Sequence, residues 1–361
     1  MLRAGVIGVG SIGRHHVRIY KQLDEVELVA IADIDEARRS ALARRYRVAA
    51  YADYEEMLTG EKLDVVSIAV PTELHRDVAL AAIARGVHVL VEKPIAASVQ
   101  QADEMIQAAA ARGLTLTVGH VERFNPAVVE LKRRLAAGEL GHVFQVHARR
   151  LSPFPTYIRD VGVVMDLATH ELDIMRYLLG SEAERIFAET ERNLHKRYED
   201  MLSGIIRFEN GIVGVLDINW LTPTKVRELR ITGERGMFLV DYLKQDLYFY
   251  ENSEAPSRWD AMALFRGVGE GNVVKLHLKR VEPLEAEIKA FLDAAAGRAQ
   301  PVVTGVDAIR ALALVQLLIA SAEAGQVLRV ADEFERRGWA ATLGIAPAYF
   351  RIAPASFGIS A

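Results

Sequence analysis

The chain has 361 residues, of which 51% are hydrophobic and 25% charged, a globular composition that excludes an intrinsically disordered protein. Its 44 basic and 48 acidic residues give a formal net charge of −4, so bulk charge does not favour nucleic acid or an anionic membrane. Cysteine is absent, which excludes disulfides, thiolate nucleophiles and iron–sulfur clusters and fits a reducing cytoplasm. We expect no signal peptide, and the apolar stretch 309–322 is shorter than the ~20 residues of a membrane span.

Residues 1–120 alternate strand-like and helix-like segments. Short β-branched runs predict strands at 4–9, 26–33, 64–70, 87–91 and 114–118. Ser98 and Gln101 predict a reciprocal capping box at the start of one helix. Strands that alternate with helices of this length pair in parallel. The sequence therefore predicts a doubly wound Rossmann domain of the α/β class over 1–120.

After residue 120, strand-like runs follow one another with fewer helices between them. They lie at 142–150, 185–192, 201–208, 212–219, 226–232, 237–241 and 246–250. Asn210-Gly211 predicts a hairpin turn, because both residues tolerate a positive φ. Helical patterns lie at 125–136, 165–179, 284–296 and 306–324. We expect a second α/β domain over 121–330 with an open, mostly antiparallel sheet, and a C-terminal extension over 331–361.

A Gly-x-Gly-x-x-Gly string lies between the first predicted strand and the first predicted helix, at Gly8-Val9-Gly10-Ser11-Ile12-Gly13. In this context Gly8 permits a tight turn and Gly10 lets the backbone approach a pyrophosphate. Gly13 lets the helix pack closely on the strand, and the helix N-terminus supplies unpaired amides to the phosphates. The string therefore predicts a dinucleotide site.

Asp33 follows Gly13 by 20 residues, at the end of the second predicted strand. Its carboxylate can accept hydrogen bonds from both ribose hydroxyls and would repel a 2′-phosphate, which favours NAD over NADP. Arg38 and Arg39 lie close by in the sequence and weaken this preference, unless they are solvated charges on the following helix. We expect NAD as the cofactor.

Two further segments place polar side chains where chemistry is expected. Glu92-Lys93-Pro94 directly follows a predicted strand, and open parallel sheets bind ligands beyond the carboxyl ends of their strands. Asp166, His170 and Asp173 share one face if their segment is helical. Histidine is a natural base and lysine can stabilise a developing oxyanion, which suits oxidation of an alcohol with a nicotinamide. Packed core residues are the alternative, and we do not expect a metal site.

In combination, these motifs resemble the Gfo/Idh/MocA oxidoreductases over residues 3–330. The resemblance implies that Lys93, Asp166 and His170 are catalytic, with His170 as acid–base and Lys93 assisting at the hydroxyl. The segment 69–75, Ala-Val-Pro-Thr-x-x-His, is similar to the family loop that passes along the cofactor. The expected cofactor-binding residues are Gly8, Gly10, Ser11, Ile12, Gly13, Asp33, Arg38, Val70, Pro71, Thr72, His75, Glu92 and Lys93.

Four segments are similar to the corresponding sequences of family members that act on nucleotide sugars: 119–126, 151–155, 160–164 and 219–225. This implies oxidation of a sugar hydroxyl, the 3-hydroxyl of UDP-N-acetylglucosamine, in amino-sugar biosynthesis. Residues 123–159 contain seven basic and two acidic residues, a local charge of +5 that would attract a diphosphate unless these are solvated surface charges. The expected substrate-binding residues are His120, Glu122, Arg123, Tyr157, Arg159, Asp166 and His170.

Two other functions fit the sequence. The first is a dehydrogenase for an uncharged polyol such as inositol or a free sugar, which Arg123, Arg149 and Arg159 pointing away from the pocket would favour. The second is a non-catalytic regulatory protein that binds NAD, against which the presence of all three catalytic candidates argues. We expect a cytoplasmic homodimer or homotetramer joined through the sheet of the C-terminal domain, with a nucleotide-sugar substrate and neither nucleic acid nor membrane as a partner.

Overall fold

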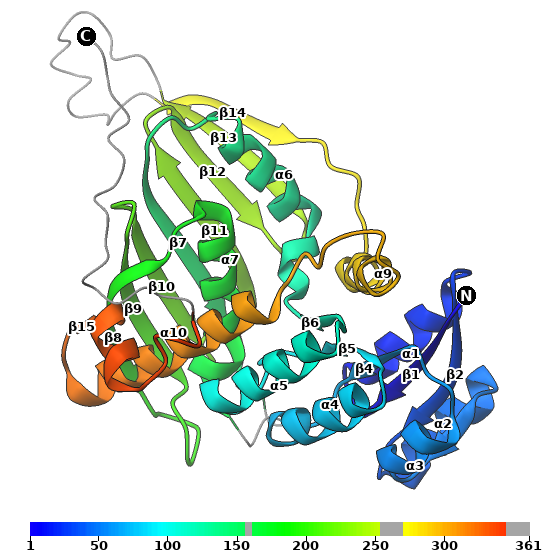
Figure 1. Cartoon of the computed structure of the whole chain (residues 1–361). Helices are drawn as coiled ribbons and strands as arrows, with labels where there is room; N and C mark the ends of the chain where they lie inside the picture. The colour runs from blue at the N-terminus through cyan, green and yellow to red at the C-terminus, as the bar shows by residue number, and fades with distance from the viewer. Residues whose placement is uncertain (156–160, 253–269, 344–361) are drawn as a thin grey trace, which may run out of the picture.

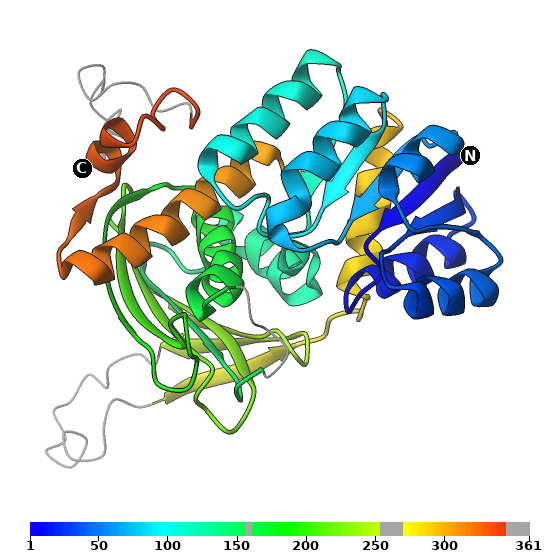
Figure 2. The same cartoon turned by 90° about the horizontal axis from the view of Figure 1, so that it is seen from below.

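The computed structural model describes residues 1–155, 161–252 and 270–343 and contains two sheets that lie in separate halves of the molecule (Figure 1). The N-terminal sheet has six strands, and the second has nine within the described residues. Helix α10 (Gly305–Ala324) runs between the second sheet and the helices of the first half (Figure 2). This arrangement confirms the expected α/β class with a Rossmann domain and a second, mostly antiparallel domain.

The N-terminal sheet is parallel throughout, in the order β3-β2-β1-β4-β5-β6. Its strands are β1 (Leu2–Ile7), β2 (Val26–Ala32), β3 (Ala49–Tyr51), β4 (Val65–Ile68), β5 (His88–Val91) and β6 (Leu116–Val118). Its helices are α1 (Gly13–Gln22), α2 (Glu36–Tyr46), α3 (Tyr54–Gly60), α4 (His75–Ala84) and α5 (Val99–Ala111). The strand order reverses between β1 and β4, and such a switch point opens a ligand crevice at the carboxyl ends.

The second sheet has the order β14-β13-β12-β11-β7-β10-β9-β8-β15. Among its described strands only β7 and β10 pair in parallel. The strands are β7 (Val143–Leu151), β8 (Ala183–Glu191), β9 (Met201–Phe208), β10 (Val213–Asn219), β11 (Val226–Gly233), β12 (Gly236–Asp241), β13 (Asp246–Asn252), β14 (Glu270–Leu276) and β15 (Leu328–Arg329). The predicted hairpin at Asn210-Gly211 is confirmed, since Gly211 joins β9 to β10 with a φ of +85°.

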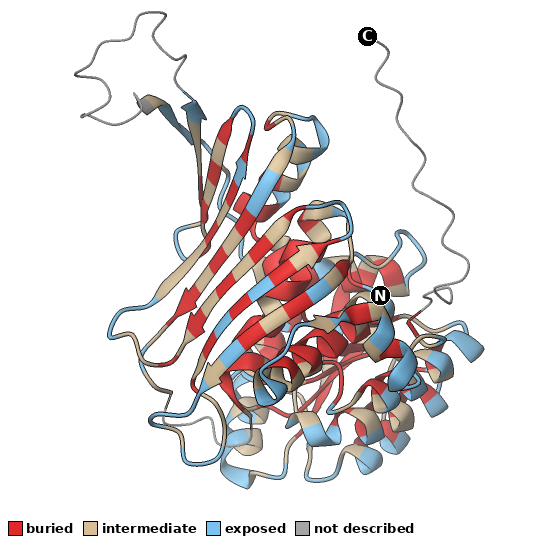
Figure 3. Ribbon diagram, turned by 90° about the vertical axis from the view of Figure 1, so that its left-hand side faces the viewer, coloured by how far each residue is buried: buried red, intermediate tan, exposed pale blue. Residues whose placement is uncertain are grey.

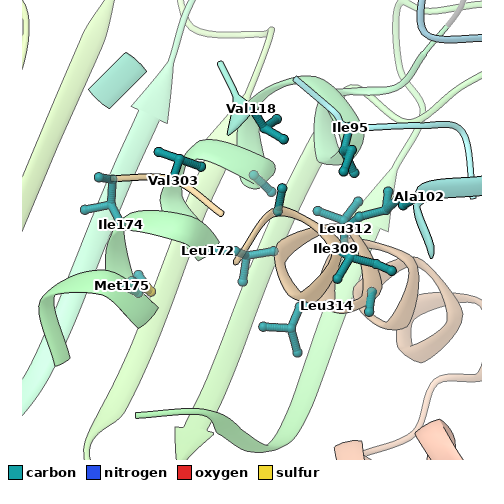
Figure 4. Packing of buried hydrophobic residues seen from close by; sticks show 14 of the residues in the cluster. Ile95, Ala102, Val118, Leu172, Ile174, Met175, Val303, Ile309, Leu312 and Leu314 are labelled. Atoms are coloured by element: carbon teal, nitrogen blue, oxygen red, sulfur yellow. The ribbon is translucent and has the colours of Figure 1, made fainter. Parts of the chain in front are cut away.

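One face of the second sheet is covered and the other is open. Buried and less buried residues alternate along the strands, as Figure 3 shows. The covered face packs against α7 (Thr169–Leu179) and α10, and Figure 4 shows Leu172, Ile309 and Leu312 meeting in this core. The other helices after residue 120, within the part of the chain that the structure describes, are η2 (Val121–Phe124), α6 (Pro126–Ala136), the π-helix η3 (Val164–Ala168), α9 (Pro283–Ala295) and α11 (Val330–Arg336).

Two segments depart from the expected domain division. Helix α9 was assigned to the second domain, yet Ile288, Phe291 and Leu292 pack with β1 and α1 on the Rossmann sheet. The segment after residue 330 was expected to be an extension, yet β15 adds to the edge of the second sheet and α11 follows it. Phe334 and Trp339 are buried in the main core, so at least residues 328–343 belong to the folded second half.

Three local expectations also need correction. The Ser98 side chain accepts a hydrogen bond from the Gln101 amide, but the Gln101 side-chain oxygen finds no partner in the described residues; the reciprocal box is at Thr304 and Asp307. The expected helix 165–179 begins with a π-helical turn, a feature common at functional sites. The apolar stretch around 309–322 belongs to α10. By length and composition this helix could span a membrane, but 61% of its apolar 18-residue segment is buried inside the fold.

Candidate active site

The glycine-rich turn between β1 and α1 leaves no room for a side chain at Gly8 or Gly13. Gly8 has a φ of +83°, and a Cβ there would lie 2.6 Å from the main-chain oxygen of Ala69. A Cβ on Gly13 would lie 1.8 Å from the main-chain oxygen of Gly8. The residues of this turn that line a cleft are Gly8, Gly10, Ser11 and Ile12. The turn is therefore a backbone cradle at the N-terminus of α1, which suits a pyrophosphate.

Asp33 directly follows β2 and lines the same cleft. Its Oδ2 accepts a hydrogen bond from the Val9 amide (2.7 Å), and its Oδ1 accepts one from the Asp35 amide (2.8 Å). Each oxygen retains capacity for ribose hydroxyls. Arg38 also lines the cleft, but it is 61% exposed and pairs with Asp35 (Nε to Oδ2, 3.1 Å). The fixed charge at this wall is thus negative, which opposes a 2′-phosphate.

The loop after β4 forms another wall of the cleft. Val70, Pro71 and Thr72 line it, ahead of the single turn η1 (Thr72–Leu74). His75 begins α4, and its ring nitrogens lie 2.9 Å from the Pro94 carbonyl oxygen and 3.0 Å from that of Val70. Burial lowers the pKa of His75, and a neutral ring can donate to only one of these carbonyls. His75 therefore ties the loop after β4 to the loop after β5.

These walls enclose a cavity of about 580 Å³, whose lining also includes Glu92, Lys93, Met165 and Asp166. The volume lies within the ~300–1,000 Å³ that is typical of ligand sites. A glycine cradle for phosphates and a carboxylate for ribose occupy one side, and the side chains that can act on a substrate lie at the other. The residues present therefore fit a nicotinamide dinucleotide.

Lys93 and Asp166 meet at the cleft although 73 residues separate them in the sequence. The Lys93 Nζ donates to Asp166 Oδ1 at 2.7 Å and to the Asp166 main-chain oxygen at 2.8 Å. Burial alone would raise the pKa of Asp166, but Lys93 and Arg150 hold it below its ordinary value. The pair is thus a lysine fixed by an ionised carboxylate, where Rossmann and second halves touch.

His170 lies one helical turn after Asp166, at the start of α7. Burial lowers its pKa well below the ordinary value, and Arg150 and Lys93 nearby add to this effect. Its Nδ1 is buried without a hydrogen-bond partner in the described residues. His170 as a whole is partly exposed. It does not line the cavity of the described structure. A neutral imidazole beside cations is available to accept a proton.

Glu92 is held from behind by a side chain that the sequence did not single out as a site residue. His16, on α1, is 1% exposed, with its Nε2 3.0 Å from Glu92 Oε1 and its Nδ1 3.0 Å from Ser67 Oγ. The Glu92 carboxylate also accepts a hydrogen bond from the Lys93 amide (3.3 Å). The available signal was the position of His16, three residues after Gly13 on the buried face of α1.

A buried charged cluster lies behind Asp166. Arg150 is 1% exposed and donates to Glu122 Oε1 (2.6 and 3.2 Å) and to Glu171 Oε1 (3.1 Å). Burial raises the pKa of Glu171 to about 7, although Arg150 opposes the shift. The Tyr242 hydroxyl donates to Glu171 Oε2 at 3.3 Å. Glu122, expected to bind substrate, is therefore engaged within this cluster.

Arg123 was expected to bind the substrate, and the structure corrects this. Its guanidinium is 4% exposed and forms a two-pronged ion pair with Asp173 (2.8 and 2.6 Å). It also reaches Asp307 at 3.4 Å and the Val302 carbonyl oxygen at 3.0 Å. His120 is 1% exposed, with its Nδ1 3.7 Å from Asp173. Asp173 thus serves an interior ion pair, and neither Arg123 nor His120 lines the described cavity.

The other basic residues of 123–159 are mostly neutralised as well. Arg149 lies 3.4 Å from Asp217, and Arg133 and Arg134 pair with Glu130 at 2.7 and 2.8 Å. Lys132 donates to the main-chain oxygens of Tyr177 and Leu178 at the end of α7. Tyr157 and Arg159 lie outside the described residues. The local charge of +5 therefore does not describe a phosphate site made by Arg123 and Arg149.

Similar proteins were found by sequence. Family models match in two parts, an oxidoreductase family with an NAD-binding Rossmann fold over residues 2–120 and a GFO/IDH/MocA C-terminal domain over residues 128–239. The UDP-N-acetylglucosamine 3-dehydrogenase of Acidithiobacillus ferrooxidans is 32% identical over 317 residues, covering 86% of this chain and 94% of that relative. The myo-inositol 2-dehydrogenase of Thermotoga maritima is 29% identical, covering 68% of this chain and 76% of that relative.

Solved structures agree with these matches. The structure of the Acidithiobacillus ferrooxidans enzyme has a TM-score of 0.78 at 30% identity and covers 90% of this chain and 98% of its own. The WlbA dehydrogenase from Bordetella pertussis, in complex with NADH and UDP-GlcNAcA, has a TM-score of 0.75 at 23% identity, covers 91% of this chain and 98% of its own, and shares the fold. With the motifs, the cleft and a relative matched over nearly its whole length, the chain belongs to the Gfo/Idh/MocA family of NAD-binding oxidoreductases.

Proposed function

We propose that this protein oxidises the 3-hydroxyl of UDP-N-acetylglucosamine to a ketone with NAD, as a step of amino-sugar biosynthesis. The observation that carries the proposal is the Lys93–Asp166 ion pair at the end of the dinucleotide cleft, with His170 one turn further on. The choice of sugar is supported by the Acidithiobacillus ferrooxidans relative, which this chain matches over 94% of that protein's length.

The proposal assigns the cofactor to residues on both walls of the cleft. When bound, the nicotinamide takes up the hydride that leaves the substrate carbon. The main-chain amides beside Gly10 and Ser11 hold the pyrophosphate, and Asp33 accepts from the ribose hydroxyls. The loop at 70–72, fixed by His75, closes the other side. Arg38 remains at the rim of this site, paired with Asp35.

The reacting hydroxyl is assigned to Lys93 and His170. Loss of a hydride leaves a carbonyl only if the hydroxyl proton also departs, so the site needs a base and a group that stabilises negative charge on oxygen. The lowered pKa keeps His170 neutral and able to take that proton. Lys93 donates a hydrogen bond to the same oxygen, and Asp166 fixes the ammonium in place (2.7 Å). Asp166 thereby positions Lys93 and balances its charge.

A substrate panel tests this function. NADH formation is followed by absorbance with UDP-N-acetylglucosamine, UDP-glucose, myo-inositol and glucose at equal concentrations. We expect turnover with UDP-N-acetylglucosamine and a 3-keto product by mass spectrometry after reductive trapping. Turnover with only the two unphosphorylated compounds would overturn the substrate proposal and leave the dehydrogenase assignment intact.

A polyol dehydrogenase is the second candidate, and a specific observation favours it. Arg123, which was expected to bind the substrate, and Arg149 are instead paired with the acidic residues Asp173 and Asp217 and do not line the cleft. The Thermotoga maritima relative, a myo-inositol 2-dehydrogenase, is 29% identical. Myo-inositol is therefore the decisive competitor in the panel. A regulatory role without turnover would require that no compound of a wider sugar and polyol panel be oxidised.

We further propose a cytoplasmic homodimer or homotetramer joined through the open face of the second sheet. The lack of cysteine fits a reducing compartment. On the open face Ile205 is 53% exposed and lines a hollow together with Phe187 and Val327. Light scattering is expected to give two or four times the mass of one chain, and Ile205→Glu a smaller species. A monomeric wild type contradicts this assembly.

A further inference from the structure

The charges around Lys93, Asp166 and the buried cluster pair off with two exceptions, Arg227 and Lys225. Lys93 is committed to Asp166, and Arg150 to Glu122 and Glu171. The Arg227 guanidinium has one ion-pair contact in the described residues, to Glu122 at the long distance of 3.8 Å, and no side-chain hydrogen bond there. Glu122 is already held by Arg150 at 2.6 Å. Arg227 is therefore only weakly compensated, and Lys225, two residues before it, has no ion pair in the described residues.

The sheet register places Arg227 on the active-site side. Arg227 lies directly across from Arg150 in the pairing of β11 with β7. Leu229 and Ile231, two and four residues further along β11, are fully buried, so Arg227 projects to the same covered face. Like charges opposite one another in a sheet destabilise it. Here Glu122 is within ion-pair distance of both arginines, 2.6 Å from Arg150 and 3.8 Å from Arg227.

The exposure of Arg227 and the charges around it favour the binding of an anion. Its side chain is 27% exposed, so solvent and a ligand can reach it. Burial and the adjacent Arg150 lower its pKa, and Arg227 in turn lowers the pKa of Lys225. The positive charge of Arg227 also lowers the pKa of both His170 and Asp166. Its contact with Glu122 places the guanidinium at the buried cluster behind Asp166, where a bound anion would relieve mutual repulsion among cations.

We propose that Arg227, with Lys225 beside it, binds the diphosphate of the substrate. The inference rests on the proposed function and names the residues by which this chain would distinguish a nucleotide sugar from a free one. A guanidinium can hold two phosphate oxygens in a fork, and the exposed Lys225 adds a second charge at the edge of the same strand. The site replaces the one that the +5 segment predicted around Arg123.

The test compares Arg227→Gln and Lys225→Gln with the wild type and with Lys244→Gln. Lys244 lies in the turn between β12 and β13 and is 69% exposed, so it is a matched loss of one charge away from the site. For each protein, KM and kcat for UDP-N-acetylglucosamine and the inhibition constant of UDP are measured at saturating NAD. Saturation keeps the pyrophosphate site of the cofactor filled.

Loss of a charge-assisted contact is worth about one to two decades of affinity. We expect Arg227→Gln to raise KM and the UDP inhibition constant together by ~10–100-fold, with kcat within ~3-fold. Lys225→Gln raises both by ~3–10-fold, Arg227→Lys restores part of the loss, and Lys244→Gln leaves both unchanged. Unchanged KM and inhibition constants in Arg227→Gln, or a fall in kcat alone, overturn the proposal. If Arg227→Gln does not fold, Lys225→Gln and Arg227→Lys decide by the same criteria.

A binding measurement separates this proposal from the proposed function. Calorimetry of NAD-saturated protein with UDP and with inorganic pyrophosphate needs no turnover. If the wild type does not oxidise UDP-N-acetylglucosamine but binds UDP in a way that Arg227→Gln abolishes, the function is wrong and the anion site stands. If the wild type oxidises the sugar and Arg227→Gln binds UDP as tightly, the function stands and the anion site is wrong. Binding of pyrophosphate alone, unaffected by either substitution, also overturns the site.

Discussion

The two sides of the cleft carry charge in different ways. On the Rossmann side, one carboxylate, Asp33, stands beside a wall of glycine and main-chain amides, and it accepts hydrogen bonds from the main-chain amides of Val9 and Asp35. On the sheet side, the described basic residues of 123–159 are engaged within the fold: Arg123, Arg149 and Arg150 by carboxylates of other segments, Arg133 and Arg134 by the nearby Glu130, and Lys132 by main-chain oxygens. The difference teaches that an excess of charge in the sequence marks a binding site only where the fold leaves that charge without a close partner.

Arg123 offers the largest test of this contrast. Arg123→Met leaves Asp173, which is 1% exposed, buried without its ion-pair partner. We expect the free energy of unfolding to fall by about 3–5 kcal/mol, measured by urea denaturation, with KM for the sugar unchanged within ~2-fold. Arg133→Met, a 62% exposed control, is expected to cost no more than ~1 kcal/mol. A raised KM with intact stability would return Arg123 to the substrate site.

Lys93 tests whether the two sides meet in one reaction. Lys93→Met removes the donor that Asp166 holds at 2.7 Å, and we expect kcat to fall by ~10²-fold or more. At 1.36 kcal/mol per decade, this is about 2.7 kcal/mol of barrier. Stopped-flow measurement of NADH formation gives the value, and Lys244→Met is the control. A variant as fast as the wild type excludes Lys93 from the chemistry.

The pH dependence of activity tests whether the surroundings of His170 lower its pKa. Its pKa is lowered, so the neutral, proton-accepting ring persists below the ordinary value of 6.5 and is lost only as the pH falls further. We therefore expect the acidic limb of kcat/KM to lie below pH 6.5. His170→Ala should lower kcat by ~10²-fold and abolish that limb, whereas the exposed His277→Ala should change neither. An acidic limb above pH 6.5 that survives in His170→Ala identifies a different base.

Asp33 gives the smallest expected effect and sharpens the cofactor side. Asp33→Ser removes the negative charge opposite the 2′ position, so we expect Kd for NAD to rise by ~10-fold and the preference for NAD over NADP to shrink. Fluorescence titration with NADH and NADPH measures both. Asp24→Ser, in the exposed loop before β2, is the control. An unchanged preference would show that Asp33 does not set the discrimination.

Some of the candidate site could be predicted because parallel β–α–β units bring sequence neighbours to the same sheet edge. The turn at Gly8 and the carboxylate of Asp33 lie as predicted in one cleft. Lys93 was placed by the same rule, since it follows β5. This rule does not place Asp166, because its contact with Lys93 spans 73 residues and depends on how the second half packs against the first. The family resemblance placed Asp166 in the catalytic set with Lys93 but did not specify the contact between them.

The rest could not be predicted from local pattern. Helix α9 follows the second sheet in sequence but packs on α1, because Phe291 and its neighbours complete the core beside β1. His16 is a helix residue whose role comes from Glu92, 76 positions away. The pairing of Arg227 with Arg150 depends on the register of β11 against β7, which no composition of either strand specifies.

By itself, the sequence determined the α/β class, the dinucleotide turn and the side chains available for chemistry, because each depends on contacts within one or two elements. The tertiary structure alone decided which charges are free to act. Arg123 was lost to Asp173, 50 residues away, and Arg150 to Glu122, 28 residues away. Arg227 has only a long contact of 3.8 Å with Glu122, which Arg150 already holds at 2.6 Å. The physical reason is that a buried ion is neutralised by the group that the fold places against it, whatever its distance along the chain.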